Sequence, residues 1–245
     1  MGMIYNLRSH LIRGRVIGVL LVILLPSIAV CAPIKGLDDL ATPIKITLLL
    51  TLIPLIPFLL LTLTSFTRIL VVFSLLRSAL SVRSAPPNQI LIGLALFMTF
   101  YIMQPTFQEI YTDAVIPYFN KDIKVEEAIK KGAKPLRQFM LKEVRDEDLA
   151  LFVHLSEQSK PNNVSEVPTT TIIPAFIISE LKIAFQIGFL IHLPFLVIDI
   201  VVASILLSMG MFMLPPMMMS VPLKLLLFVL VDGWNLIVGS LVRSF

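Results

Sequence analysis

The sequence predicts an all-α integral membrane protein, with about four long, kinked apolar helices in two hairpins and a small helical soluble segment between them. Of its 245 residues, 57% are hydrophobic, and the mean hydropathy is +0.92. A soluble domain cannot bury that much apolar surface. The apolar runs reach about 20 residues, the length at which a helix spans a bilayer, whereas barrel strands are about 10 residues long and alternate in polarity.

Residues 1–32 have the pattern of a secretory signal peptide. Three arginines without an acidic residue precede an apolar core, and small residues follow it. We expect cleavage after Ala32. An uncleaved membrane anchor is the alternative, whereas a lipoprotein site at Cys31 is disfavoured because the preceding residue, Val30, is not small.

The first predicted hairpin occupies residues 33–111. Its spans are expected at about 46–67 and 88–110, two stretches long enough to cross a bilayer. Two prolines should kink the first span. The arginines near the connecting loop, 78–87, indicate that this loop is cytoplasmic.

Residues 112–171 form a charged segment, with 10 acidic and 9 basic residues, that we expect to be helical and extracytoplasmic. The pattern predicts a short helix over 125–131 that Gly132 stops. A second helix would begin at Pro135, and Asp146 would cap a third. A segment of about 60 residues hardly builds a core alone, so it should pack on neighbouring elements.

The second predicted hairpin is 172–245, with a methionine-rich bend at 209–219. This methionine bend holds six methionines, and Gly210 and a Pro-Pro step interrupt helical continuity there. If the signal peptide is cleaved, the bend lies on the cytoplasmic side, and the charged segment and the C-terminus lie outside.

Two charges interrupt the apolar helices that flank the bend. Asp199 lies 12 residues before Met211, and Lys224 lies 13 residues after it. Antiparallel helices would bring them level. Because an isolated charge in hydrocarbon costs about 3 kcal/mol on insertion scales, we expect an ion pair or an intersubunit contact. A proton-relay role for Asp199 is the alternative.

Three further charges lie within or beside apolar runs. Glu180 and Lys182 are two residues apart, so they face different sides of a helix and pair poorly with each other. Contacts to another subunit and ordinary interfacial anchoring explain them equally well. For Arg68, snorkelling to the interface competes with a contact to a partner subunit.

Enzyme chemistry has no support in the sequence. The three histidines are far apart and have no ligand at metal-binding spacing, and we find no Gly-rich phosphate loop and no nucleophile beside a base. The net charge of +4 is partly that of the signal peptide and does not indicate nucleic-acid binding. The sequence therefore predicts no catalytic residue, metal or cofactor.

Several long stretches resemble the FliP family of bacterial flagellar export-gate proteins. They are TSFTRILVVFSLLRSAL and PPNQILIGLALFMTFYIMQP within residues 62–105, PLRQFMLKEVRDEDLALF at 135–152, and PAFIISELKIAFQIGFLIHLPFLVIDIVVASILLSMGMFMLPP at 174–216. SVPLKLLLFVLVDGWNLIVGSL continues the resemblance at 220–241. The resemblance covers nearly all of the mature chain in order.

The resemblance implies a pore-forming subunit of the flagellar type III protein export apparatus, in the bacterial inner membrane at the flagellar basal body. Several copies of such a subunit, about five, assemble with FliQ and FliR beneath FlhA and FlhB, pass unfolded flagellar proteins and sit among lipids. The equivalent subunit of a virulence type III secretion system is the alternative. The signal peptide favours the flagellar version, because the virulence version usually lacks one.

The family closes its pore with a Gly-Met-Met-Met loop, which matches Gly210, Met211, Phe212 and Met213 here. Phenylalanine replaces the middle methionine, but it is also large and apolar. Methionine is long and polarizable, so a ring of them can deform around varied chains, and an apolar constriction can gate by dewetting. In the alternative interpretation, the methionines only fill gaps between helices.

Two other function classes compete with a protein-export pore. A small-solute or proton transporter would also have kinked helices and intramembrane charges, but four spans are few and no inverted repeat is evident. A scaffold without a pore is the other class. It should tolerate polar substitutions in the methionine bend, whereas a seal should leak.

Overall fold

The computed structural model describes the chain in several stretches and confirms the all-helical prediction for them. They comprise residues 54–82, 85–156, 163, 166–211 and 213–245, together with 47, 50 and 51. No strand occurs among these residues. All the helices below belong to one compact unit, Leu55–Phe245. The predicted signal peptide, 1–32, lies outside the described residues.

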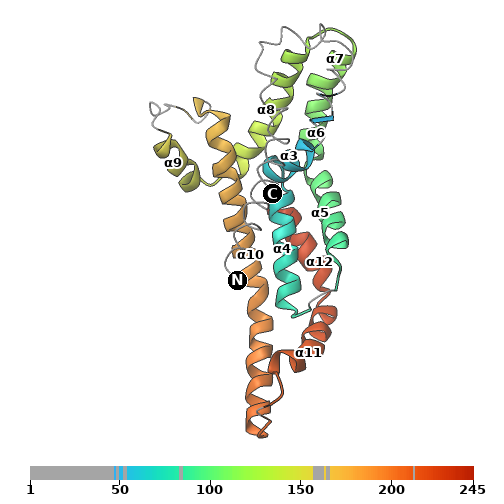
Figure 1. Cartoon of the computed structure of the whole chain (residues 1–245), viewed down its shortest axis with the longest axis vertical. Helices are drawn as coiled ribbons and strands as arrows, with labels where there is room; N and C mark the ends of the chain where they lie inside the picture. Colours follow the sequence, from blue (N-terminus) through green and yellow to red (C-terminus); the bar gives the residue numbers. More distant parts are fainter. Residues whose placement is uncertain are drawn as a thin grey trace, which may run out of the picture. The chain divides into compact units, whose positions relative to one another are not determined.

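Ten α-helices and one π-helical turn follow one another in this unit (Figure 1). They are α3 Leu55–Leu63, α4 Phe66–Ala79, α5 Asn88–Ile102, α6 Gln104–Ile110, the π-helix η2 Tyr111–Val115, α7 Ile116–Phe119, α8 Val125–Glu143, α9 Asp146–Leu155, α10 Thr169–Ser208, α11 Pro216–Leu230 and α12 Gly233–Arg243.

The central element is α10, a helix of 40 residues that packs on α4, α8, α9 and α11. Its closest partner is α4, whose Ile69, Val72 and Phe73 are completely buried. The two helices approach closely at Gly188, where an added Cβ would lie 2.2 Å from Leu75 Cδ1. The core therefore forms where α4 lies against α10 (Figure 1).

By length and composition, only α10 among the described helices could cross a membrane unaided. The number rises to four if each of three bent helix pairs counts as one span. These pairs are Pro57–Leu63 with Phe66–Ala79 at 85°, Asn88–Ile102 with Gln104–Phe119 at 63°, and Pro216–Leu230 with Gly233–Arg243 at 65°. The spans predicted at 46–67 and 88–110, and the apolar helix predicted after the methionine bend, are thus sharply broken in their described parts.

The first break falls between α3 and α4, not at the prolines expected to kink this span. Side-chain hydroxyls replace lost helical hydrogen bonds there, since Thr64 Oγ1 donates to the Leu60 carbonyl and Thr67 Oγ1 to the Leu61 carbonyl. Such hydroxyl-to-carbonyl bonds compete with the helix ladder and favour bending. The threonines, rather than proline, explain where the chain turns.

The other two breaks also have local causes. Pro105 lies in the first turn of α6, where its missing N–H costs nothing, and it ends α5 at Ile102. Asp232 adopts the left-handed conformation, with φ +49°, between α11 and α12. The next residue, Gly233, makes room for Phe228, because an added Cβ would lie 2.2 Å from the Phe228 ring.

Two predictions about helix boundaries are wrong. The expected stop at Gly132 and new start at Pro135 do not occur, because α8 runs without interruption from Val125 to Glu143. A Cβ added at Gly132 would make ordinary van der Waals contact with Ala114 Cβ at 3.6 Å, so the packing there does not require glycine. The methionine bend is also shorter than 209–219, since α11 already begins at Pro216. Gly210 turns the chain there with φ +74°.

The close approach at Gly188 predicts that Gly188→Ala destabilises the protein. Overpacking a filled core costs about 1–3 kcal/mol, which exceeds the roughly 1 kcal/mol that alanine gains over glycine in a helix. The melting temperature in detergent should therefore fall. Gly93→Ala is the matched control, because its Cβ would meet no atom within 4 Å, and this variant should melt at the same or a higher temperature. Equal shifts in both variants would contradict the packing argument.

Candidate functional site

The candidate site extends along α10, which carries four polar side chains that contact other helices and which ends at the methionine bend. Nearest its N-terminus are Ser179, Glu180 and Lys182, and Asp199 follows about 19 residues further along. At a rise of 1.5 Å per residue, this separation is about 30 Å, close to the thickness of a bilayer core. The contacts of Ser179, Glu180 and Lys182 therefore lie close to one level of α10, and those of Asp199 lie at another.

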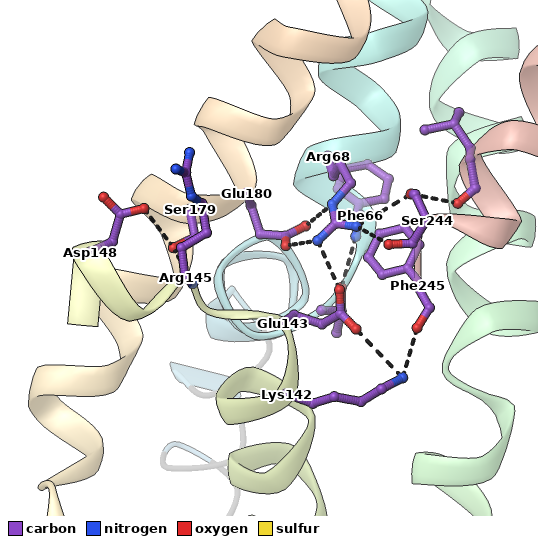
Figure 2. A network of polar contacts seen from close by, with 12 residues as sticks. Phe66, Arg68, Lys142, Glu143, Arg145, Asp148, Ser179, Glu180, Ser244 and Phe245 are labelled. Atoms are coloured by element: carbon purple, nitrogen blue, oxygen red, sulfur yellow. Dashed lines mark hydrogen bonds and ion pairs between the residues drawn. The ribbon is translucent and has the colours of Figure 1, made fainter. Parts of the chain in front are cut away.

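The largest polar cluster surrounds Arg68 of α4 (Figure 2). Arg68 Nε donates to Glu180 Oε2 at 2.9 Å, and Nη2 donates to the other Glu180 oxygen. Nη2 also donates to Glu143 Oε2 of α8 at 3.0 Å. The Arg68 and Glu180 side chains are buried almost completely, at 1% and 0% exposed. One guanidinium thus joins α4, α8 and α10.

The end of the chain completes this Arg68 cluster. Arg68 Nη1 donates to the Ser244 carbonyl at 2.9 Å and to Ser244 Oγ at 3.3 Å. The Phe245 ring lies under the guanidinium, 3.8 Å from Arg68 Cζ, and stacks on Phe139 with a centroid distance of 6.4 Å. Lys142 Nζ donates to the Phe245 carbonyl at 2.7 Å.

The Arg68 cluster satisfies its buried cation fully. A guanidinium has five N–H donors, and these five contacts to Glu180, Glu143 and Ser244 use them all. Desolvating an ion costs several kcal/mol, which a buried pair recovers only with complete hydrogen bonding. Lys142 Nζ, 3.6 Å from Glu143 Oε1, offsets the second carboxylate.

A second polar cluster joins α9 to α10. Asp148 accepts hydrogen bonds from Lys182 Nζ and from Ser179 Oγ, the latter at 2.9 Å, and the Arg145 backbone N–H donates to Ser179 Oγ at 3.0 Å. Burial alone would raise the pKa of Asp148. The hydrogen bonds from Lys182 and Ser179 and the charges of Lys182 and Arg145 outweigh it and hold this pKa below its ordinary value.

The structure brings Asp199 of α10 and Lys224 of α11 together, with Lys224 Nζ 2.7 Å from Asp199 Oδ2. Lys224 also donates to the Ala79 carbonyl at 3.1 Å and to Ser81 Oγ at 2.8 Å, so its three donors are all used. Ser220 Oγ donates to the other Asp199 oxygen. This pair therefore joins α10, α11 and the end of α4.

The methionine bend presents its side chains outward. Met213 is 97% exposed and Met211 is 42% exposed. The neighbouring methionines, Met209 and 217–219, range from 48% to 70%. Phe212 lies outside the described residues. These apolar side chains have little cover within the chain, so they are available to other molecules.

Comparison with known proteins identifies the family. Residues 49–241 match the FliP family. The chain belongs to this family. It is 53% identical over 208 residues to the flagellar biosynthetic protein FliP of Bacillus subtilis (strain 168), covering 85% of this chain and 94% of that protein.

Two further flagellar biosynthetic proteins FliP give similar matches. The protein of Buchnera aphidicola subsp. Acyrthosiphon pisum (strain APS) is 52% identical over 86% of this chain and 55% of its own length. That of Pectobacterium carotovorum subsp. carotovorum is 51% identical over 82% and 78%. The predicted resemblance to the FliP family is confirmed, and with it the prediction of a flagellar biosynthesis protein of the export apparatus.

Sequence reasoning missed most of the partners in this FliP-family chain. The sequence suggests contacts with other subunits for Arg68 and for Glu180, yet the two residues are partners of each other. Lys182 binds Asp148 in the same way. Nothing marks out Asp148 or Glu143 in the sequence, because the charged segment 112–171 contains many similar residues.

The chemistry of these clusters is that of structural ion pairs. Among the described residues, no group of three or more His, Cys, Asp or Glu side chains could hold a metal ion. Each buried cation described above instead has a carboxylate partner and hydrogen bonds to neighbouring helices. The clusters can therefore fix how α4, α8, α9, α10 and α11 pack.

Replacing Arg68 alone should cost more stability than replacing Arg68 and Glu180 together. Arg68→Met leaves the buried Glu180 without its cation, and breaking a buried pair in this way costs about 3–5 kcal/mol in the free energy of unfolding. The double variant Arg68→Met/Glu180→Gln should lose less than the single variant, as measured by chemical unfolding in detergent. Lys131→Met is the control. Its pair with Glu127 is exposed, so it should cost at most about 1 kcal/mol. Additive losses at Arg68 and Glu180 would contradict the coupling.

The lowered pKa of Asp148 gives a pH dependence. The folded pKa lies below the ordinary value of 3.8, so protonation favours the unfolded state, and stability that is complete above pH 3.8 is lost as the pH falls through the folded pKa. Asp148→Asn should lower the melting temperature at pH 7 and flatten its decline below pH 4. Glu147→Gln, whose side chain is 76% exposed, should leave the profile nearly unchanged. A profile that Asp148→Asn does not alter would refute this assignment.

Proposed function

We propose that this chain is a pore-forming subunit of the flagellar export gate, through which unfolded flagellar proteins cross the inner membrane. It would act as a non-enzymatic, multi-pass membrane protein at the flagellar basal body. FliP-family membership supports the setting. The exposed methionine bend is the observation that carries the pore role.

The exposure of the methionines favours a seal over gap filling. Side chains that fill gaps between helices of their own subunit would be buried, as Met103 and Met140 are at 0% and 1% exposed. Met211 and Met213 are instead available to neighbouring copies. A ring of such loops would form an apolar gasket, and we place Phe212 in it because of its position between them.

Several copies of the chain, about five, would surround the pore, since repeated heterologous contacts close into a ring or a short spiral. FliQ, FliR, FlhA and FlhB are the proposed partners in this assembly, and lipid surrounds it. Within each copy, α10 and the three bent helix pairs would supply four spans in two hairpins, with residues 112–171 outside. Complete burial among other subunits would let some of these helices leave the bilayer plane.

The pair Asp199–Lys224 would then hold the pore-forming hairpin together. Its residues join α10 and α11, the two helices on either side of the methionine bend. All three Lys224 donors are occupied, which favours a structural pair over the proton-relay alternative for Asp199. Arg68, Glu180 and Lys182 would serve the same purpose nearer the outer end.

Neutralising one partner of this pair should harm export more than neutralising both. Lys224→Met leaves the Asp199 carboxylate without its cation, and Asp199→Asn leaves a buried lysine, so each single change destabilises the assembled gate. The double variant should recover part of the swimming motility and of the secreted flagellar protein. Equal, independent losses with a worse double variant would argue against pairing and for separate roles.

The equivalent subunit of a virulence secretion system is the second candidate, and a small-solute transporter is the third. A strain that lacks this chain distinguishes the first two candidates. It should fail to secrete flagellar proteins if the first is right, and virulence proteins if the second is right. A transporter would show transport of a small solute by the chain alone, which an export gate that needs its partners would not.

The seal itself can be tested by conductance. Met211→Ala/Met213→Ala removes large apolar side chains from the constriction, which should admit water and ions. We expect a raised ion leak through membranes that contain the assembled apparatus, with altered export of flagellar proteins.

Met211→Leu/Met213→Leu is the matched control. Leucine keeps the volume and apolarity, so this variant should seal like the unaltered protein. Unchanged conductance and export in the alanine variant would refute the gasket and favour the scaffold.

A further inference from the structure

The methionines of this chain divide into two groups by their exposure. Within the described residues, Met98, Met103 and Met140 are packed in the interior, at 6%, 0% and 1% exposed. The six methionines of the methionine bend are instead between 42% and 97% exposed. No described methionine has an exposure between these two ranges, so the thioethers of the bend are the ones that dissolved reagents can reach.

Met213 is the most exposed of them. Its exposed fraction of 97% is the highest among the large apolar side chains of the described residues. It lies in the bend between the end of α10, at Ser208, and the start of α11, at Pro216 (Figure 1). Met211 lies two residues earlier and is 42% exposed. Because the rest of the chain covers so little of them, both thioethers are open to small molecules dissolved in water.

A thioether is the one group of the bend that hydrogen peroxide changes under mild conditions. The other residues of 209–219 are glycine, phenylalanine, leucine and proline, which it leaves intact. In the reaction, a lone pair of the sulfur attacks one peroxide oxygen and the O–O bond breaks. That oxygen stays on the sulfur as a sulfoxide, and the other oxygen leaves as water with both hydrogens. The sulfur loses two electrons and the peroxide gains them.

The product differs from its precursor in polarity. A methionine sulfoxide is polar, whereas methionine is a flexible apolar side chain. Burying the new acceptor oxygen without a hydrogen-bond donor is costly, and residues 209–219 offer no side-chain donor. Water would take this place. A constriction that excludes ions by staying dry loses its barrier once it is wetted.

We propose that Met211 and Met213 form a redox-sensitive modification site, at which peroxide opens the seal of the export gate. This inference rests on the proposed pore function and adds regulation to it. A constriction separates two water-filled spaces, so its thioethers meet dissolved peroxide even while copies of the chain contact one another. The oxidised gate would conduct ions in the absence of an export substrate.

The modification would be reversible, and its effect would be confined to the bend. Methionine sulfoxide reductases, one for each sulfoxide epimer, return the side chain to a thioether. The oxygen then leaves as water, and two thiols are oxidised to a disulfide. Met103 and Met140, which are packed inside the subunit, are out of reach of peroxide in the folded chain. The packing of the helices therefore survives the treatment that wets the bend.

Planar bilayers that contain the assembled apparatus test the proposal. Hydrogen peroxide is added on both sides, the ion conductance is recorded, and the sulfoxides are then mapped by mass spectrometry of the digested protein. We expect the ion leak to rise several-fold as Met211 and Met213 each gain one oxygen, while Met103 and Met140 stay unmodified. Both sulfoxide reductases, supplied with dithiothreitol, should return the leak to its starting value.

Two leucine variants assign the effect to the constriction. Met211→Leu/Met213→Leu keeps the volume and apolarity of the side chains but has no thioether there, so peroxide should leave its leak unchanged. Met218→Leu/Met219→Leu is the matched control. It removes two exposed methionines and keeps Met211 and Met213, so peroxide should raise its leak as in the unaltered protein. Reversal by the reductases requires no substitution and therefore applies even if a variant fails to assemble.

Any of four results would overturn the proposal. The thioethers of Met211 and Met213 could stay intact in the assembled apparatus and react only after denaturation. The leak could stay constant although both residues carry a sulfoxide, or rise and resist the reductases. Finally, Met211→Leu/Met213→Leu could be as sensitive to peroxide as the unaltered protein.

The variant Met211→Ala/Met213→Ala keeps this failure separate from failure of the pore. If this variant leaks without peroxide while oxidation of the unaltered protein has no effect, the pore stands and the redox site is wrong. If neither the alanine substitutions nor peroxide raises the leak, the pore function itself is wrong.

Discussion

The arrangement of this protein depends on the buried guanidinium of Arg68. Its five donors reach Glu180 on α10, Glu143 on α8 and Ser244 after α12. Elements from distant parts of the sequence must therefore converge on one point, since a desolvated cation with missing partners would be costly. Because α4 is fixed in this way against α10, the apolar core between them can close around Gly188.

The same logic divides the surface of the subunit. Buried charges, such as Lys224, are paired within the chain, while much of the large apolar surface, including Met213, is left uncovered. A bilayer covers part of such a surface. We propose that the protruding methionines at the bend contact other copies, because methionine side chains can adapt to one another and to a passing chain. Buried charges that are paired within the chain, together with large exposed apolar side chains, fit a subunit that assembles with other proteins.

Much of the fold could be predicted from the sequence, and much of the site could not. Hydropathy indicated the helices, and the similar spacing of Asp199 and Lys224 from Met211, 12 and 13 residues, indicated that the two side chains could come level. Periodicity gave no sign of the 85° break after Leu63, because threonine hydroxyls cause it rather than proline. The partner of Arg68 was also out of reach, because Glu180 lies 112 residues away and only tertiary packing brings them together.

The central claim is that several copies of this chain surround one pore. Native mass spectrometry of the complex, purified through this chain from its own membrane in mild detergent, tests it most directly. The account predicts one particle with several copies, about five, together with other proteins of the export gate, as expected for repeated heterologous contacts. A particle with a single copy would leave no ring for the methionines to close and would contradict the account.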